Sequence, residues 1–117
     1  MKFQTKEEDH YFLVTLGDEK IDSNLSPELK GHIINVSSKN PDKHLIIDLS
    51  KVRFADSSGL SAFLLAYRLY RDHSRVCVFA GPSPSIIELF EISQLINVFP
   101  IAENVDVAIA MLNQVKK

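Results

Sequence analysis

The stretch LIIDLSKVRFADSSGL, residues 45–60, decides the fold of this chain. The run at residues 44–49 is apolar apart from His44 and Asp48 and does not alternate, which is typical of a strand covered on both faces in a parallel sheet. A short polar loop follows, and the sequence DSSG at residues 56–59 then opens a helix. Asp56 is the expected N-cap, because its carboxylate can accept hydrogen bonds from amides of the next turn. The stretch therefore predicts one strand-to-helix unit of an α/β sheet.

On both sides of this unit, apolar strands continue to alternate with helices. Strands are predicted at residues 3–5, 11–16, 75–80 and 98–101, and helices from Ser26 to about 36–38, at 57–71, from 84 or 85 to 92, and at 105–115. Ser26 reads as an N-cap, with Pro27 at the first helical position. The alternation after an initial hairpin implies parallel pairing through crossover helices. We predict one α/β domain over residues 1–117, with a mixed, mostly parallel sheet, an N-terminal hairpin and about four flanking helices.

Composition narrows the function classes. A chain of 117 residues that is 45% hydrophobic fits one domain with its own core. The net charge of −2 suggests neither a nucleic-acid partner nor an anionic membrane surface. The N-terminus lacks the apolar segment of a signal peptide, and the apolar runs are too short to cross a bilayer. A cytoplasmic protein without direct membrane insertion is the expectation.

Neither a metal site nor a cofactor is predicted. Cys77 lies in an apolar run and reads as a small buried hydrophobe, and the four histidines do not form a short metal-ligand spacing. The chain has no Gly-x-Ser-x-Gly elbow and no glycine-rich phosphate loop. An enzyme is therefore not expected.

The first turn of the helix at residues 57–71 is chemically unusual. Capping alone explains Asp56 and Ser57 as well as a functional role does. Capping does not explain Ser58 and Gly59 as readily. Glycine in a helix costs roughly 1 kcal/mol of stability relative to alanine, so Gly59 needs a further reason. Gly59 indicates either close packing against a neighbouring strand or loop, or the approach of an outside partner. A small hydroxyl-bearing surface of this kind suits a reversible phosphate.

The same helix carries apolar residues on two faces. One face, predicted to cover the sheet, holds Leu60, Phe63, Leu64 and Tyr67. The opposite face, beginning at Ser58, holds Ala62, Leu65 and Leu69. That second face is either an exposed docking stripe or buried between two neighbouring helices. A phosphate on Ser58 would bring a charge near −2 to such a contact, and ~100-fold weaker binding or more is the expected result.

These residues resemble the STAS domain family and, within it, the bacterial anti-sigma factor antagonists. The match lies in the strand at residues 45–49 and in residues 52–60, and the order of elements agrees along essentially the whole chain. The resemblance implies a STAS-like fold and a regulator that binds an anti-sigma factor, itself a serine kinase, and thereby frees sigma. Ser58 would be the phosphoacceptor, and a PP2C-type phosphatase would reverse the modification.

The resemblance also implies a wider partner-binding surface. Asp56 and Ser57 would support Ser58, and Asp22 and Ser23 would lie close on the same side. The segment at residues 17–22 departs from the family pattern by being one residue longer and more charged. Two other functions stay open: a STAS subunit that is never phosphorylated, on a transporter ATPase or in a larger signalling complex, and an enzyme that uses Ser58 or a bound nucleotide.

Overall fold

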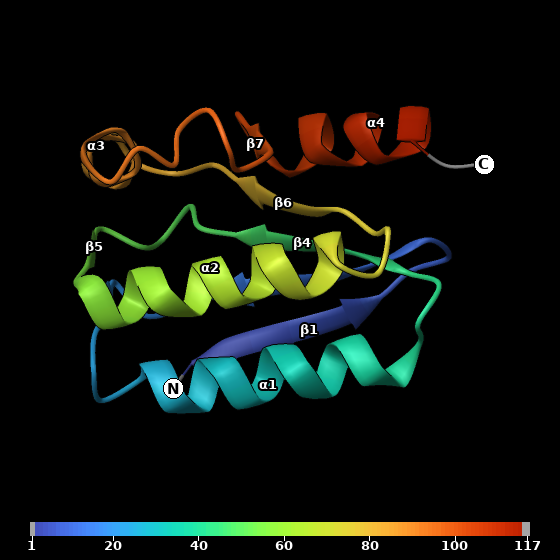
Figure 1. Cartoon of the computed structure of the whole chain (residues 1–117), viewed down its shortest axis with the longest axis horizontal. Helices are drawn as coiled ribbons and strands as arrows, with labels where there is room; N and C mark the ends of the chain where they lie inside the picture. Colours follow the sequence, from blue (N-terminus) through green and yellow to red (C-terminus); the bar gives the residue numbers. More distant parts are fainter. Residues whose placement is uncertain (1, 116–117) are drawn as a thin grey trace.

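Five strands form the central sheet, in the order β1-β2-β4-β6-β7 (Figure 1). The computed structural model describes residues 2–115. β1 runs antiparallel to β2, and every later neighbour in the sheet is parallel. The strands are β1 (Phe3–Glu7), β2 (Tyr11–Leu16), β4 (His44–Asp48), β6 (Cys77–Ala80) and β7 (Ile101–Ala102). The predicted mixed, mostly parallel sheet with an N-terminal hairpin is confirmed.

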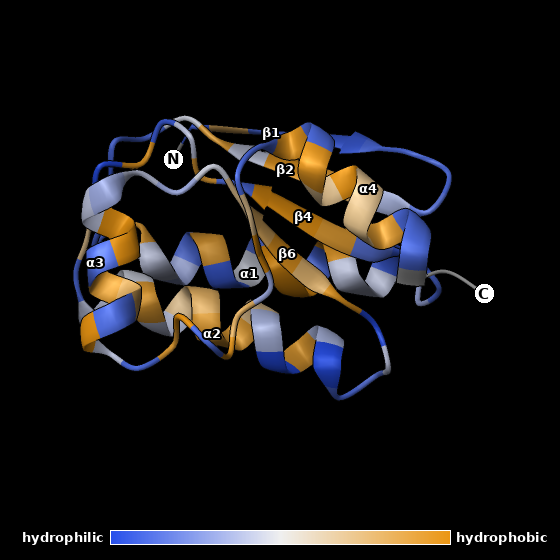
Figure 2. Ribbon diagram, turned by 90° about the horizontal axis from the view of Figure 1, so that it is seen from above, coloured by the Kyte–Doolittle hydropathy of each residue, from blue (hydrophilic) through white to orange (hydrophobic). Residues whose placement is uncertain are grey.

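Helices cover the two faces of the sheet. They are α1 (Ser26–Lys39), α2 (Ser57–Arg71), α3 (Pro84–Ile92) and α4 (Val105–Val115). The strands β4 and β6, coloured as apolar in Figure 2, lie between α4 on one face and the layer of α1 and α2 on the other. The two faces bury separate clusters, the larger one against α1, α2 and α3 and the smaller one against α4. Burial on both faces explains why residues 45–47 of β4 are all apolar instead of alternating.

A second, two-stranded sheet was not anticipated from the sequence. β3 (Lys20–Ile21) pairs in parallel with β5 (Phe54–Ala55), so that Ile21 lies opposite Ala55. Each strand has only two residues, too few to show any hydrophobic periodicity. The pair joins the loop before α1 to the loop before α2.

Three boundaries differ from the sequence-based expectations. Ser26 is not an N-cap: Leu25 occupies that position without a side-chain hydrogen bond, and Ser26 is buried at 3% exposure. The strand expected at residues 75–80 begins only at Cys77, because the Arg75 amide bonds back to the Tyr70 carbonyl and the Val76 amide bonds to the His44 side chain. The strand expected at 98–101 is displaced to Ile101–Ala102, because the amides of residues 98 and 99 bond back to the Leu95 carbonyl.

Arg75 closes the C-terminal end of α1. Its Nη1 donates to the carbonyls of Ser37 and Asn40, each at 3.4 Å, and to that of Lys43 at 3.2 Å. Its Nη2 donates to Ser37 Oγ at 2.8 Å. The guanidinium carbon lies 4.3 Å from the centroid of the Tyr70 ring. A buried cation thus satisfies carbonyls at and just beyond the helix end, where the macrodipole is negative.

Cys77 is buried in the sheet, as expected, and burial raises the pKa of its thiol. Within residues 2–115, no helix is both long enough and apolar enough to cross a membrane. The described part of the chain also lacks any group of three or more His, Cys, Asp or Glu side chains that could hold a metal ion.

Candidate functional site

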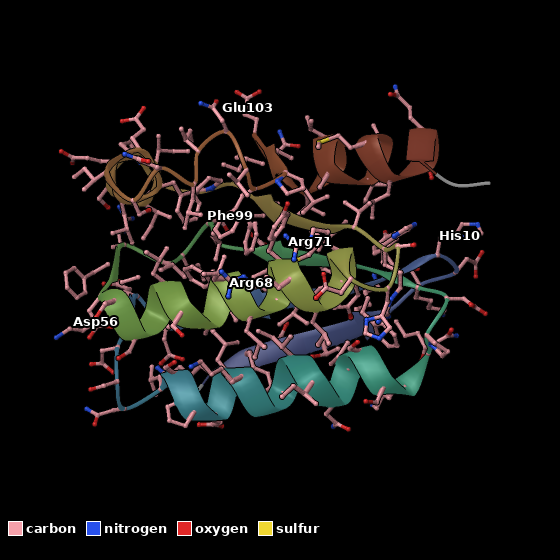
Figure 3. All side chains as sticks on the ribbon, viewed as in Figure 1. His10, Asp56, Arg68, Arg71, Phe99 and Glu103 are labelled. Atoms are coloured by element: carbon pink, nitrogen blue, oxygen red, sulfur yellow. The ribbon has the colours of Figure 1, made fainter. Side chains whose placement is uncertain are left out.

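The N-terminal ends of α1 and α2 meet at one end of the molecule, next to the β3–β5 pair (Figure 1). Asp56, labelled in Figure 3, begins α2 there, whereas His10 lies at the far end of the β1–β2 hairpin. The amide of Asp56 donates to the Ile21 carbonyl at 3.3 Å. The short parallel pair therefore sets the position at which α2 starts, relative to the loop that leads into α1.

Asp56 is the N-cap of α2, as predicted. Its Oδ1 accepts from the amides of Ser58 at 2.9 Å and Gly59 at 3.0 Å. The Asp56 backbone is extended, which is the usual conformation of an N-cap residue. Two of the amides that a helix N-terminus leaves unpaired are therefore already bonded to a carboxylate.

Gly59 is required by packing within the chain. A Cβ atom at this position would lie 2.4 Å from the Ile21 carbonyl oxygen and 3.1 Å from the Ala55 Cβ. A backbone oxygen that is held in the β3–β5 pair cannot move aside cheaply. Of the two explanations left open by the sequence, close packing against a neighbouring strand accounts for Gly59, which is buried and not directly accessible to a partner.

Hydroxyl groups line a shallow groove of about 280 Å³ where the first turns of α1 and α2 face one another. Ser57 and Ser61 are exposed, and Ser58 is half-buried. Ser26 Oγ donates to the carbonyl oxygen of Ser58 at 2.8 Å and so ties the two helices together. The groove is lined by Ser23, Ser26, Pro27, Lys30, Ser57, Ser58 and Ser61.

The structure brings most of the sequence-predicted residues to this end of the molecule. Ser23 lines the groove together with Ser57 and Ser58. Asp22 lies in the loop just before them, and its Oδ1 accepts from the Asn24 amide at 3.0 Å. Asp22 thus shapes the turn that leads into α1, and its carbonyl accepts from the amides of residues 25 and 26.

The predicted docking stripe on α2 needs correction. Ala62 is 0% exposed, because α1 packs closely against this side of α2. Leu69 is half-buried against the main core, and only part of Leu65 reaches the surface, in a second groove beside Lys30 and Arg68. The buried face of α2 centres on Ala62, Phe63, Ala66 and Tyr70. The alternative that the sequence left open, burial between helices, therefore holds for most of the stripe.

The apolar surface at this end comes instead from β5 and α3. Phe54 is 51% exposed and Ile92 is 74% exposed, and both line an apolar groove of about 200 Å³ together with Leu89. The ammonium of Lys20 lies 5.8 Å from the Phe54 ring centroid. Sequence patterns missed this surface, although Phe54 stands only two residues before Asp56, because nothing in the sequence shows that α3 packs beside β5.

The geometry of this end can now be compared with known proteins. A family model described as STAS domain matches residues 2–108. The chain belongs to the STAS domain family. The match covers all the elements described above except the last part of α4, and it therefore spans the residues of the β3–β5 pair, the capped start of α2 and the groove.

Similar STAS proteins carry related names. The chain is 29% identical over 101 residues to a protein of Listeria monocytogenes named anti-sigma-B factor antagonist, covering 86% of each. It is 26% identical over 106 residues to an anti-sigma F factor antagonist of Paenibacillus polymyxa, covering 89% of this chain and 90% of that protein.

A solved structure agrees with this fold. An anti-sigma factor antagonist from Mycobacterium paratuberculosis superimposes with a TM-score of 0.83 at 23% identity, covering 96% of this chain and 93% of that one. At this level of identity the superposition establishes the shared fold.

Proposed function

We propose that this STAS domain is an anti-sigma factor antagonist that is switched by phosphorylation of Ser58. With a free hydroxyl, the domain binds an anti-sigma factor that is also a serine kinase, and sigma is released. The observation that carries the proposal is the position of Ser58, half-buried in an open groove at the capped start of α2. The names of the relatives at 29% and 26% identity support the choice of partner.

The docking surface combines the serine groove with the apolar groove of β5 and α3. Phe54 stands two residues before the N-cap Asp56, and Ile92 lines the same apolar groove as Phe54. Exposed aromatic and aliphatic side chains of this kind stabilise protein complexes when they are buried by a partner. The start of α2 separates the two grooves, since Ala55 lines the apolar groove and Ser57 lines the serine groove. A partner that covers the start of α2 would exclude water from both.

Phosphorylation reverses the binding. The γ-phosphoryl group of the partner's ATP is transferred to Ser58 Oγ: the new P–O bond forms, the bond to ADP breaks, and the hydroxyl proton is released. The product carries a charge of about −1.5 to −2 next to Asp56. Burying that charge under a partner without full pairing costs several kcal/mol, so the affinity falls about 100-fold or more. A PP2C-type phosphatase restores the hydroxyl.

The test uses the chain as bait in its own host, followed by the purified partner. Ser58→Ala keeps the small uncharged side chain and should capture a kinase of the histidine-kinase ATPase fold, whereas Ser58→Asp should lose it. Ser38→Asp, which adds the same charge to an exposed position toward the other end of α1, is the matched control and should bind normally. Equal capture by the two Ser58 variants would refute the switch.

Two further measurements sharpen the test. Incubation of the wild type with the purified kinase and Mg-ATP should place one phosphate on Ser58, located by mass spectrometry. Ile92→Ser should weaken the complex at least tenfold, whereas Ile34→Ser, at another exposed isoleucine, on α1, should not. Phosphate transfer to another serine would contradict the assigned site, and equal effects of the two isoleucine variants would contradict the assigned surface.

A further inference from the structure

The Asp56 carboxylate occupies backbone amides at the start of α2 that could otherwise bond a phosphate on Ser58. The start of a helix normally stabilises an anion through its free amides and the positive end of its dipole. In α2, the amides of Ser58 and Gly59 are already bonded to the Asp56 carboxylate. A phosphate on the neighbouring hydroxyl would add negative charge beside that carboxylate, so a positive charge from another element would stabilise it.

α1 supplies such a charge at the right place. Among the described residues that line the serine groove, Lys30 alone is charged. Lys30 follows Ser26 by about one helical turn, and the Ser26 hydroxyl donates to the backbone carbonyl of Ser58 at 2.8 Å. Helical side chains lean toward the N-terminus of their helix, which directs the Lys30 stem back toward Ser26 and the motif.

The Lys30 ammonium is available for a new partner. Within residues 2–115, its side chain forms no salt bridge or hydrogen bond. Lys30 also lines the adjoining groove with Ser61 and Leu65, so that it bridges the two hollows between α1 and α2. The N-terminus of α1 has no side-chain cap, which leaves the positive end of its dipole on the same side.

We propose that Lys30 is the intramolecular counter-ion of phosphorylated Ser58. The ammonium pairs with the phosphate across the groove between α1 and α2, and holds the modified side chain against its own domain. This inference rests on the proposed function, because it concerns the phosphorylated form. In the unmodified form the same ammonium lines the open groove, where a docked partner can reach it. Modification therefore removes a positive charge from the docking surface as well as adding a negative one.

The test measures the second pKa of the phosphate itself. Phosphoserine is installed at position 58 during biosynthesis, so no kinase is needed, and the 31P chemical shift is followed from pH 4 to 8. This pKa is ordinarily near 6. A neighbouring ammonium favours the dianion, so the pKa in the otherwise wild-type chain should lie about 0.2–0.7 unit below that in the Lys30→Gln variant. Asp22 and Asp56 are present in both proteins, so the difference isolates Lys30.

Three controls fix the interpretation. Lys30→Arg should keep the low pKa, because the charge is retained. Lys39→Gln should leave the pKa unchanged, because Lys39 lies nine residues further along α1, roughly 13 Å away and beyond the Debye length at 0.1 M salt. Thermal unfolding of the unmodified Lys30→Gln chain should match the wild type, which excludes a purely structural effect.

Two results would overturn the ion pair between Lys30 and the phosphate on Ser58. A pKa that is the same with Lys30 and with Gln, or a low pKa that persists in 1 M NaCl, overturns the ion pair. The proposed function fails by a different result, namely the lack of phosphate transfer to Ser58 by the purified kinase. The two failures are therefore distinguishable.

Discussion

The two ends of α1 differ in how their polar groups are satisfied. At the C-terminal end, carbonyls bond to the guanidinium of Arg75, which is only 8% exposed. At the N-terminal end, Ser57 and Ser61 stay exposed beside the half-buried Ser58, and Lys30 has no ion pair among the described side chains. The difference teaches that the fold pairs polar groups within the chain at one end and leaves polar side chains exposed at the other. Four predictions test this comparison.

The largest effect is expected at the C-terminal end of α1, which Arg75 closes and which we call the closed end. Arg75→Ala removes the donor to three carbonyls and to the Ser37 hydroxyl, and also the cation over the Tyr70 ring. Leaving buried acceptors unpaired should lower the free energy of unfolding by about 3 kcal/mol, measured by urea denaturation. Arg71→Ala, at an exposed arginine bonded to its neighbour Asp72, should cost less than about 0.5 kcal/mol. Similar losses for the two variants would contradict the buried cap.

Gly59 provides the next test, at the open end, where the first turns of α1 and α2 meet. The lack of a side chain at Gly59 lets the start of α2 pack closely against the β3–β5 pair. Gly59→Ala places a Cβ 2.4 Å from the Ile21 carbonyl oxygen and should cost about 2 kcal/mol. Gly31 is the matched control: it lies in α1, where an added Cβ would meet no atom within 4 Å, so Gly31→Ala should stabilise by about 0.5–1 kcal/mol. If thermal unfolding shows the same direction for both, the close approach at Gly59 is wrong.

A smaller effect is expected from the tie between the two helices. Ser26→Ala removes the hydrogen bond to the Ser58 carbonyl and should lower stability by about 1 kcal/mol. Ser38→Ala is the control, because the Ser38 hydroxyl bonds to the Ile34 carbonyl at an exposed position of the same helix, and its loss should be nearly neutral. The measurement is the urea midpoint at neutral pH. No loss for Ser26→Ala would show that the tie does not hold the groove together.

The closed end should also respond to pH. Burial, and then the charge of Arg75, lower the pKa of His44, whose Nδ1 accepts from the Val76 amide at 3.0 Å. Because the folded-state pKa lies below the unfolded value of about 6.5, the stabilisation is complete above that pH and is lost as the pH falls below it. His44→Asn should flatten the decline in urea midpoint between pH 7 and 5. His32, whose pKa burial also lowers, contributes to the slope that remains. An unchanged slope in the His44 variant would exclude His44.

The sequence predicted those parts of the site that depend only on residues close by in the sequence. Asp56 could be assigned as an N-cap because a cap bonds only to the next turn. The roles of Gly59 and Ser26 depend on residues more than thirty positions away, brought close by strands too short to carry a periodic pattern. A helical wheel found the apolar residues of α2, but it could not show that α1 covers Ala62.

The apolar groove of β5 and α3 was missed for the same reason: local sequence patterns do not show contacts between distant elements. Phe54 and Ile92 come from separate elements, and neither belongs to a periodic pattern that marks a surface. Their proximity is a property of the tertiary fold. The sequence therefore predicted a candidate site at Ser58, whereas the shape of the surrounding surface required the structure.

The burial of Cys77 makes the molecule convenient for spectroscopy. The chain has a single cysteine, and burial keeps its thiol protonated and out of reach of alkylating reagents. A second cysteine introduced by Ser57→Cys, on the rim of the serine groove, would therefore be the one to take up a maleimide fluorophore. Its emission would report, in real time, the arrival and departure of whatever covers that rim.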